Sequence, residues 1–344
     1  MLLLTKNIKI SVFARICLAA CLFLCCAMQA EGQNSWAREH QAARNMVNEE
    51  RMMLDISFLS DSLCQGRATG TRGGAEAAFW VERQFRRSGL LPFDDTYSKH
   101  VWVGKGLVGH NVIGMFPGSI KSPCNKYIIV GAHYDHIGVL DGKMYPGADS
   151  NASGTVALTV LADMFAAMTA TGQTYDTNII FVAFDAKEMN MTGSESFWRM
   201  IENEELNDPL TGAPVTPEKI QLMVNIDQIG STLSPIRRRR PDYMIMLGTE
   251  SLKPIKREML DICNRLYGTY LDIGLSYYGS EQFTRIFYRL SDQKVFVDNG
   301  IPAVMFTSGI TMNNNKTRDT AQTLDMEILR KRIYLIYHWI DRML

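Results

Sequence analysis

Four side chains that can bind a metal ion follow apolar segments of this chain. His133 closes the apolar run 127–133, and Asp149 stands in a glycine-rich loop shortly after it. Glu188 comes just after the run 178–185, and Asp227 closes the run 222–227. Imidazole and carboxylate ligands without thiolates are typical of catalytic zinc sites. The pattern therefore predicts a metal-dependent active site.

Each of these residues also has an ordinary structural explanation when it is taken alone. An Asp after a strand, such as Asp149 or Asp227, is most often a helix cap or a turn residue. Glu188 alone would be a solvated loop charge, and His133 alone would be a hydrogen-bonded core histidine. Their joint placement at successive strand ends is what indicates a site.

The elements that must position these residues alternate between strands and helices. Strands are expected over 111–116, 127–133, 178–185, 222–227, 243–247 and 302–307. Helices are expected over 74–88, 153–170, 192–202, 252–267 and 326–344, after a polar helical region over 36–63. This alternation predicts a single α/β domain over residues 31–344, with a mostly parallel mixed central sheet and helices on both faces. Sites in such sheets gather at the carboxyl ends of the strands.

Composition excludes some classes of partner. The chain has 36 Lys and Arg against 36 Asp and Glu, so no net field favours a nucleic acid or an anionic membrane. Four consecutive arginines at 237–240 are the local exception, and either a solvated loop or an anion-binding patch accounts for them. We expect no nucleic-acid partner and no membrane span.

The first thirty residues have the pattern of a secretory signal peptide. Basic residues up to Arg15 precede an apolar run over 16–28, which ends at Ala30 before a polar stretch. The apolar run is short for a bilayer span. We therefore expect a secreted or periplasmic protein cleaved near Ala30, with lipid anchoring at Cys21 as the alternative. The three cysteines beyond the signal are expected to be free thiols.

Several motifs, in order, resemble one family over nearly the whole mature chain. They are Gly66-Arg67, Asn111-Val112-Ile113-Gly114, His133-Tyr134-Asp135-His136, Gly147-Ala148-Asp149-Ser150-Asn151, Asn225-Ile226-Asp227 and Gly300-Ile301-Pro302-Ala303. The chain resembles the zinc exopeptidases of metallopeptidase family twenty-eight, which include aminopeptidase Y, the Streptomyces and Vibrio leucyl aminopeptidases and glutamate carboxypeptidase. The family's fold is the zinc-exopeptidase, phosphorylase/hydrolase-like fold.

The resemblance implies a role for each matching residue. One zinc would be held by His133, Asp149 and Asp227, with Asp149 bridging to a second zinc that Glu188 also binds. Asp135 would lie behind His133 and hold its imidazole in the correct tautomer. The substrates implied are peptides or other amino-acyl compounds.

One departure from the family concerns the second metal ion. The family has a histidine ligand just before an Asp-Thr pair, and here the aligned residue is Asn315. An amide oxygen suits calcium or magnesium better than zinc. We therefore expect one zinc, with the second bound poorly.

A second departure concerns the general base. The family's Glu-Glu pair reads Lys187-Glu188 here, and a protonated lysine cannot accept a proton from metal-bound water. Lys187 would also repel a divalent ion by an energy on the order of 6 kcal/mol at roughly 5 Å. It should therefore either pair with a carboxylate such as Glu188 or lose its proton.

Two functions remain open from the sequence. The first is a metallo-exopeptidase that removes N-terminal residues from peptides, with weak or lost activity. The alternative is a non-catalytic member of the family that binds a peptide or another ligand in the same cleft. Glutaminyl cyclase chemistry ranks below both, because it relies on the same base and the same late histidine.

Overall fold

The computed structural model describes residues 40–121, 123–232, 241–277 and 279–344. The expected signal segment and the arginine run 237–240 lie outside the described residues. The chain divides into two compact units, Met1–Gln41 and Ala42–Leu344, and the description below concerns the second.

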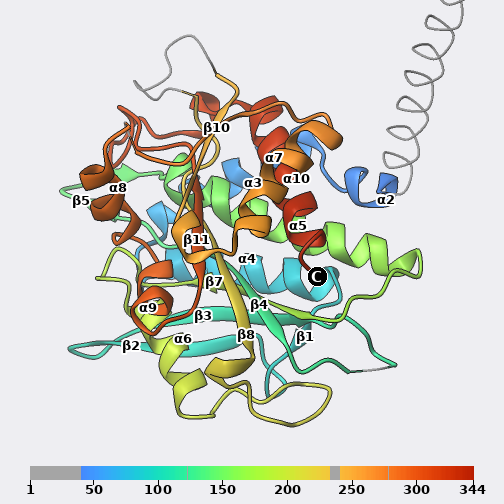
Figure 1. The fold of residues 1–344 in the computed structure, drawn as a ribbon. Helices are drawn as coiled ribbons and strands as arrows, with labels where there is room; N and C mark the ends of the chain where they lie inside the picture. The colour runs from blue at the N-terminus through green and yellow to red at the C-terminus, as the bar shows by residue number, and fades with distance from the viewer. Residues whose placement is uncertain (1–39, 122, 233–240, 278) are drawn as a thin grey trace, which may run out of the picture. The chain divides into compact units, whose positions relative to one another are not determined.

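The central sheet has nine strands (Figure 1). They are β1 (Leu91–Pro92), β2 (Ser98–Gly104), β3 (Leu107–Phe116), β4 (Tyr127–His133), β7 (Asn178–Phe184), β8 (Ile220–Ile226), β9 (Tyr243–Leu247), β10 (Asp272–Gly274) and β11 (Ala303–Thr307). Their order is β1-β3-β7-β4-β8-β11-β9-β10, and β2 pairs with β3 at one edge. A separate hairpin consists of β5 (Gly138–Leu140) and β6 (Lys143–Tyr145).

The parallel part of the sheet is its centre. Strands β7, β4, β8 and β11 run parallel to one another, and β10 runs parallel to β9. The pairings β1–β3, β2–β3, β3–β7 and β9–β11 are antiparallel. The predicted mixed α/β sheet is therefore confirmed, with its antiparallel pairings on either side of a parallel centre.

Helices cover both faces of this sheet. The helices of the described residues are α2 (Gln41–Arg44), α3 (Glu49–Leu59), α4 (Arg72–Arg87), α5 (Ser153–Ala170), α6 (Thr192–Glu202), α7 (Pro254–Leu266), α8 (Glu281–Tyr288), α9 (Gln293–Asp298) and α10 (Met326–Asp341). Helix α5 contacts β3, β4, β7 and β8 on one face and is covered in turn by α3, α4 and α10. Helices α6 and α9 contact each other and the opposite face.

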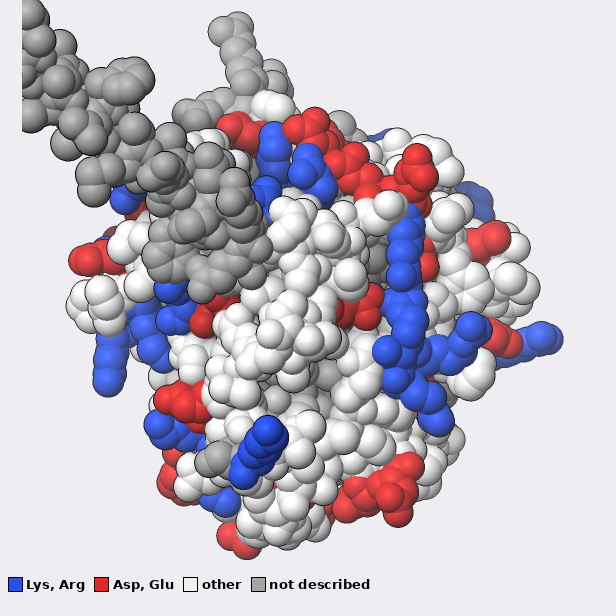
Figure 2. Space-filling model, turned by 90° about the vertical axis from the view of Figure 1, so that its right-hand side faces the viewer, with Lys and Arg blue, Asp and Glu red and all other residues white. Residues whose placement is uncertain are grey.

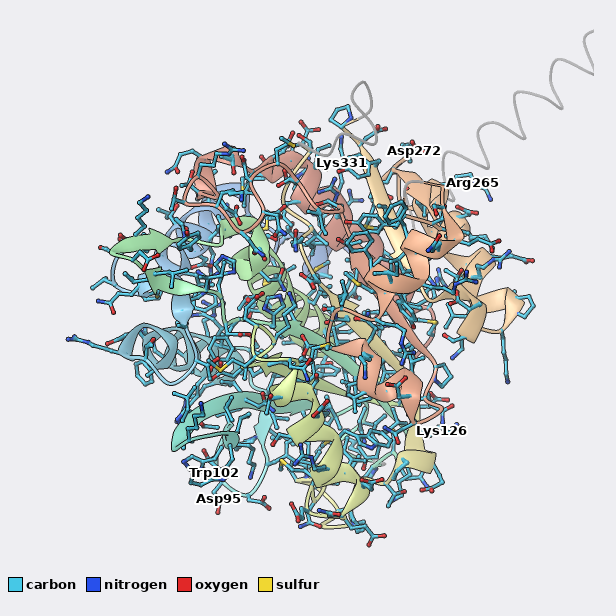
Figure 3. All side chains as sticks on the ribbon, turned by 90° about the vertical axis from the view of Figure 1, so that its left-hand side faces the viewer. Asp95, Trp102, Lys126, Arg265, Asp272 and Lys331 are labelled. Atoms are coloured by element: carbon cyan, nitrogen blue, oxygen red, sulfur yellow. The ribbon has the colours of Figure 1, made fainter. Side chains whose placement is uncertain are left out.

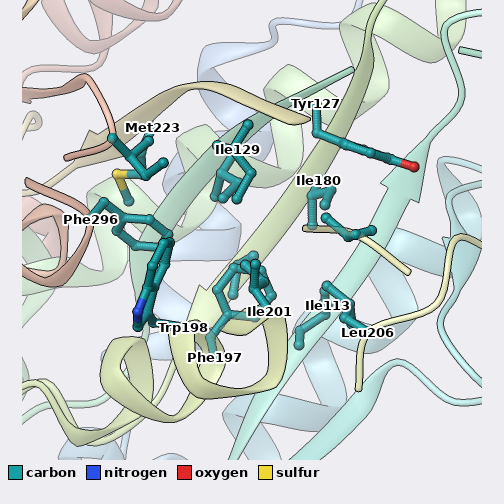
Figure 4. Close-up of a cluster of buried hydrophobic side chains, with 14 of the residues drawn as sticks. Ile113, Tyr127, Ile129, Ile180, Phe197, Trp198, Ile201, Leu206, Met223 and Phe296 are labelled. Carbon is teal, nitrogen blue, oxygen red and sulfur yellow. The ribbon is translucent and has the colours of Figure 1, made fainter. Parts of the chain in front are cut away.

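The strands at the centre are buried on both sides. Every residue of β4 and β7 is buried, which explains their continuous apolar sequence. Alternate side chains such as Ile129 and Ile180 join Phe197 and Trp198 of α6 in one apolar cluster (Figure 4). On the other face, Phe181 packs against Phe165 of α5 with ring centroids 6.4 Å apart. The central strand ends are therefore fixed by packing from both layers.

The edges and the surface differ from this centre. Trp102 projects from the edge strand β2 and is 73% exposed (Figure 3). Lysine, arginine and acidic side chains are interspersed around a broad uncharged area in Figure 2. This mixture agrees with the zero formal net charge of the chain.

Two further sequence features have a clear place in the fold. Among the described residues, the one segment long and apolar enough to cross a membrane is Ala148–Ala170, and 78% of its most apolar window is buried in the protein. Such burial is that of a core helix lying against a sheet. Cys64 and Cys263 are free thiols, as predicted.

Candidate functional site

The carboxyl ends of three parallel strands, β7, β4 and β8, meet at one edge of the sheet. Strand β4 ends at His133, β8 is followed by Asp227, and β7 leads to Lys187 and Glu188. His133 Nε2 lies 3.4 Å from Asp227 Oδ1, and both side chains are buried. The topology therefore brings the predicted imidazole and one predicted carboxylate together.

Asp135 connects two of these strand ends. Its carboxylate accepts hydrogen bonds from the backbone N–H of Lys187 at 3.1 Å and of Glu188 at 3.0 Å. Its Oδ1 also lies 3.4 Å from His133 Nδ1. Asp135 therefore lies beside His133, and it also holds the Lys187-Glu188 pair against the end of β4.

Lys187 forms an ion pair with its neighbour Glu188. Lys187 Nζ donates to Glu188 Oε1 at 3.1 Å, and the two side chains are 15% and 26% exposed. Burial acts to lower the pKa of Lys187, but the charges of Asp227 and Glu188 outweigh it and hold the pKa above its ordinary value. Of the two outcomes expected for Lys187, the structure has the lysine paired with a carboxylate.

The charge of Lys187 also acts on the strand-end residues. Burial raises the pKa of Asp227, but Lys187 and His133 outweigh burial and hold that pKa below its ordinary range. Burial and Lys187 lower the pKa of His133, whereas Asp227 and Asp135 raise it, and the net result is a pKa of about 10.

Asp149 has a different environment from the one predicted for a bridging ligand. Its Oδ1 accepts hydrogen bonds from the Gly230 N–H at 2.8 Å and the Ser153 hydroxyl at 3.1 Å. Burial and the nearby Asp319 raise the pKa of its carboxyl to about 7. Asp319 also accepts from the backbone N–H groups of Asp149 and Ser150. These contacts fix the loop through Asp149 Oδ1 and leave Asp149 Oδ2 without a hydrogen-bond partner among the described residues.

A pocket of about 230 Å³ opens above the strand ends. Its lining comprises Ser150, Lys187, Glu188, Asp227, Gln228, Tyr277, Phe287, Leu290, Ser291, Met305, Thr307, Ile310, Asn314 and Asn315. The lining thus includes Asn315, at the predicted degenerate ligand position, and it includes Ser150 rather than Asp149. The Ser150 hydroxyl is buried and has no hydrogen-bond partner within the described chain.

Arg67 is a positioning residue whose role the sequence did not reveal. Its buried guanidinium donates to the carbonyl groups of Tyr134 at 2.7 Å, Pro146 at 2.7 Å and Gly147 at 2.7 Å. It thereby ties the loop after β4 to the loop that carries Ser150. The signal available in the sequence was the Gly66-Arg67 motif, which gave no indication of these contacts.

Ser291 is a second residue that the sequence left without a role. Its hydroxyl donates to Asp227 Oδ2 at 2.7 Å and accepts from the Asn225 amide at 2.9 Å. The same amide donates to Gln293 Oε1 at 2.7 Å. Gln293 therefore orients Asn225 and, through it, the Ser291 partner of Asp227.

The donor set matches part of a metal centre. His133 Nε2, Asp227 Oδ1 and Asp149 Oδ2 are buried and have no hydrogen-bond partner within the described chain, as expected of atoms that bind a cation. However, no three His, Cys, Asp or Glu side chains of the described residues are grouped so that they could hold a metal ion. Ser150 and Asn315 add only neutral oxygens to the pocket, and Lys187 adds a positive charge. These residues do not fit a two-zinc centre.

The sequence was compared with known families and proteins. Residues 111–340 match the model of peptidase family M28. None of the curated protein sequences searched matches the chain.

Solved structures share the fold at low sequence identity. The LapA aminopeptidase of Legionella pneumophila is 18% identical with a TM-score of 0.66, over 89% of this chain and 74% of that one. A zinc aminopeptidase from Bacillus subtilis is 12% identical with a TM-score of 0.63, over 86% and 95% of the two chains. The glutaminyl cyclase of Macrostomum lignano is 14% identical with a TM-score of 0.67, over 89% and 92%. Aminopeptidases and glutaminyl cyclases thus have the same fold as this chain.

Proposed function

The chain belongs to peptidase family M28, and we propose that it is a peptidase-like protein that binds peptides or other amino-acyl ligands with weak or no hydrolysis. The observation that carries this proposal is the ion pair between Lys187 and Glu188 at the pocket. Peptide hydrolysis needs a group that takes a proton from the attacking water and gives it to the leaving amine. A lysine held in its charged form has no free electron pair with which to accept that proton.

The lining residues can still bind a ligand. The carboxylates of Asp227 and Glu188 can accept hydrogen bonds from a ligand ammonium group, and Lys187 can donate to a carbonyl or carboxylate. The lining also includes apolar side chains, among them the stacked rings of Tyr277 and Phe287, whose centroids lie 4.4 Å apart. A polar floor and an aromatic wall are the usual components of a small-ligand site. An amino-acyl group with an apolar side chain matches both.

A hydrolysis assay tests the catalytic half of the proposal. The purified protein would be incubated with fluorogenic amino-acyl amides in the presence of zinc. We expect a kcat/KM below roughly 10 M⁻¹s⁻¹, against the 10⁴–10⁸ M⁻¹s⁻¹ typical of enzymes. The variant Lys187→Glu combined with Ser150→Asp and Asn315→His restores acidic and imidazole groups on the pocket wall, and its rate should exceed that of the unmodified protein. An unmodified protein with kcat/KM near 10⁴ M⁻¹s⁻¹ would be an aminopeptidase instead.

A binding assay tests the other half. We expect the dipeptide Leu-Gly to bind with a Kd of about 1 mM or tighter by calorimetry, equivalent to roughly 4 kcal/mol. Phe287→Ala should weaken this binding, because it removes an aromatic group from the pocket wall. Ile286→Ala is the matched control, since Ile286 lies on the same helix, is 48% exposed and does not line the pocket. Equal affinities of the two variants would show that the ligand binds elsewhere.

We also propose that the protein works outside the cytoplasm. The support is the signal-like pattern of residues 1–30 in the sequence. Cell fractionation with an antibody against the domain should detect a shortened protein in the periplasm or the medium. A full-length protein in the cytoplasm would refute this.

A further inference from the structure

We propose that the ammonium group of Lys187 is a built-in cation, which occupies the place of a metal ion on the acidic floor of the pocket. The inference concerns the same site as the proposed function. It is tested by metal content and thermal stability, which do not depend on whether the pocket hydrolyses or binds a peptide. It follows from the mismatch between the donor set of the pocket and a two-zinc centre.

The first step is the balance of charge around the pocket. Two carboxylates, Asp227 and Glu188, belong to its lining, and Asp227 is only 3% exposed. Among the described residues of the lining, Lys187 is the one cationic residue, and its Nζ lies 3.1 Å from Glu188 Oε1. Buried carboxylates need a nearby positive charge or their burial is strongly unfavourable. Lys187 supplies that charge from within the chain.

The second step is the position of the ammonium. Lys187 Nζ lies 3.1 Å from Glu188 Oε1, which is hydrogen-bonding distance. The backbone of both residues is anchored, since their N–H groups donate to the two carboxylate oxygens of Asp135. Asp135 in turn lies beside His133, so the ammonium is attached to the same framework that positions the strand-end residues. Lys187 therefore stays at the floor of the pocket without help from a ligand.

The third step is the chemistry of the remaining wall. Ser150 and Asn315 line the pocket and contribute a hydroxyl and an amide, which carry no charge. A divalent ion in this pocket would meet two carboxylates but also the repulsion of the ammonium. An ammonium is a compact charge with three donors, so it can satisfy carboxylates that a metal ion would otherwise bind. The ammonium therefore supplies a positive charge to the pocket lining without a metal ion.

The experiment measures zinc content and thermal unfolding of the full chain and two variants. Lys187→Met removes the charge and keeps most of the side-chain volume. Lys294→Met is the matched control, because Lys294 is also ion-paired to a carboxylate, at 2.8 Å to Asp298, but lies outside this pocket. Each protein would be dialysed against equimolar zinc for elemental analysis, and its Tm would be measured in EDTA and in zinc.

The expected results follow from replacing the ammonium of Lys187 by a zinc ion. The unmodified protein and Lys294→Met should hold well under one zinc per chain and have the same Tm in EDTA and in zinc. Lys187→Met should unfold roughly 5 °C lower in EDTA and regain much of that loss in zinc. Its zinc affinity should rise at least tenfold.

Two results would overturn the inference. One is an unmodified protein that holds one or more zinc ions per chain and loses stability in EDTA. The other is a Lys187→Met protein that gains no affinity for zinc. If Lys187→Met does not fold, Lys187→Gln takes its place, and the metal content of the unmodified protein still decides the question.

Discussion

Replacing Arg67 by methionine is the sharpest test of how the fold positions the pocket. The guanidinium is fully buried and donates to four carbonyl groups, those of Leu59 at 2.5 Å and of Tyr134, Pro146 and Gly147 at 2.7 Å each. Methionine fills a similar volume and donates no hydrogen bond. All four carbonyl groups would therefore be left without this partner.

The expected loss of stability follows from these contacts. A hydrogen bond to a charged group contributes about 1.5–3 kcal/mol, so four such bonds amount to roughly 6–12 kcal/mol. Burial of the guanidinium costs several kcal/mol, which the substitution recovers. The net loss in the free energy of unfolding should be about 4 kcal/mol. Arg67→Lys should lower the free energy of unfolding by about 2 kcal/mol, because a single ammonium group cannot reach all the carbonyl groups that surround the planar guanidinium.

Urea denaturation followed by circular dichroism measures this loss. The control is Arg72→Met, since Arg72 is 84% exposed and its nearest carboxylate, on Glu76, is 3.8 Å away. That variant should stay within about 0.5 kcal/mol of the unmodified protein. A loss below about 1 kcal/mol for Arg67→Met would refute the reasoning, because the loops around the pocket would then hold their places without the guanidinium.

Three other predictions concern the framework of the site. Asp135→Asn should lower the free energy of unfolding by about 2 kcal/mol in urea, because one of the two carboxylate oxygens that accept backbone N–H groups is lost. An unchanged midpoint of urea denaturation would contradict this. Gly193→Ala should lower the free energy of unfolding by at least about 2 kcal/mol in the same assay, because a Cβ there would lie 1.9 Å from the Asp185 carbonyl oxygen. Gly274→Ala is the control and should be nearly neutral, since the atom nearest to its Cβ would be 3.8 Å away. Burial raises the pKa of Asp292 to about 7, so its ionisation weakens the fold as the pH rises from about 4 to 7. The free energy of unfolding of Asp292→Asn, measured in urea, should therefore exceed that of the unmodified protein by roughly 4 kcal/mol at pH 8 and by little at pH 4. Equal increases at the two pH values would contradict this sign.

Much of the fold was predictable from the sequence. Strands β4 and β9 and helices α5 and α6 have the predicted bounds, because their apolar runs are long and end at clear polar or glycine residues. The predicted helical region 36–63 is interrupted at Asn48, whose side chain accepts a hydrogen bond from the Arg51 N–H and begins α3. The edge strands β1, β2 and β10 and the short helices α8 and α9 were not predicted. They are short or exposed, so their sequences have little apolar periodicity.

The site was predictable to the extent that strand order determines it. His133, Asp135 and Asp227 lie together because each follows or closes a parallel strand at the centre of the sheet. The loop over Ala148–Ala152 was harder, since neighbouring residues in an irregular turn point in different directions, and the pocket is lined by Ser150 instead of Asp149. The contacts of Arg67 could not be predicted either. These contacts are hydrogen bonds to backbone carbonyl groups, and because every residue has a carbonyl group, no residue type in the sequence indicates them.

Anomalous diffraction from crystals grown with zinc, recorded at the zinc absorption edge, tests the central claim most directly. If Lys187 is the cation of the pocket, the map should have no anomalous peak between His133 and Asp227, and the Lys187–Glu188 ion pair should be intact. A zinc peak bound by His133 and Asp227, with Lys187 turned away from the pocket, would contradict the account.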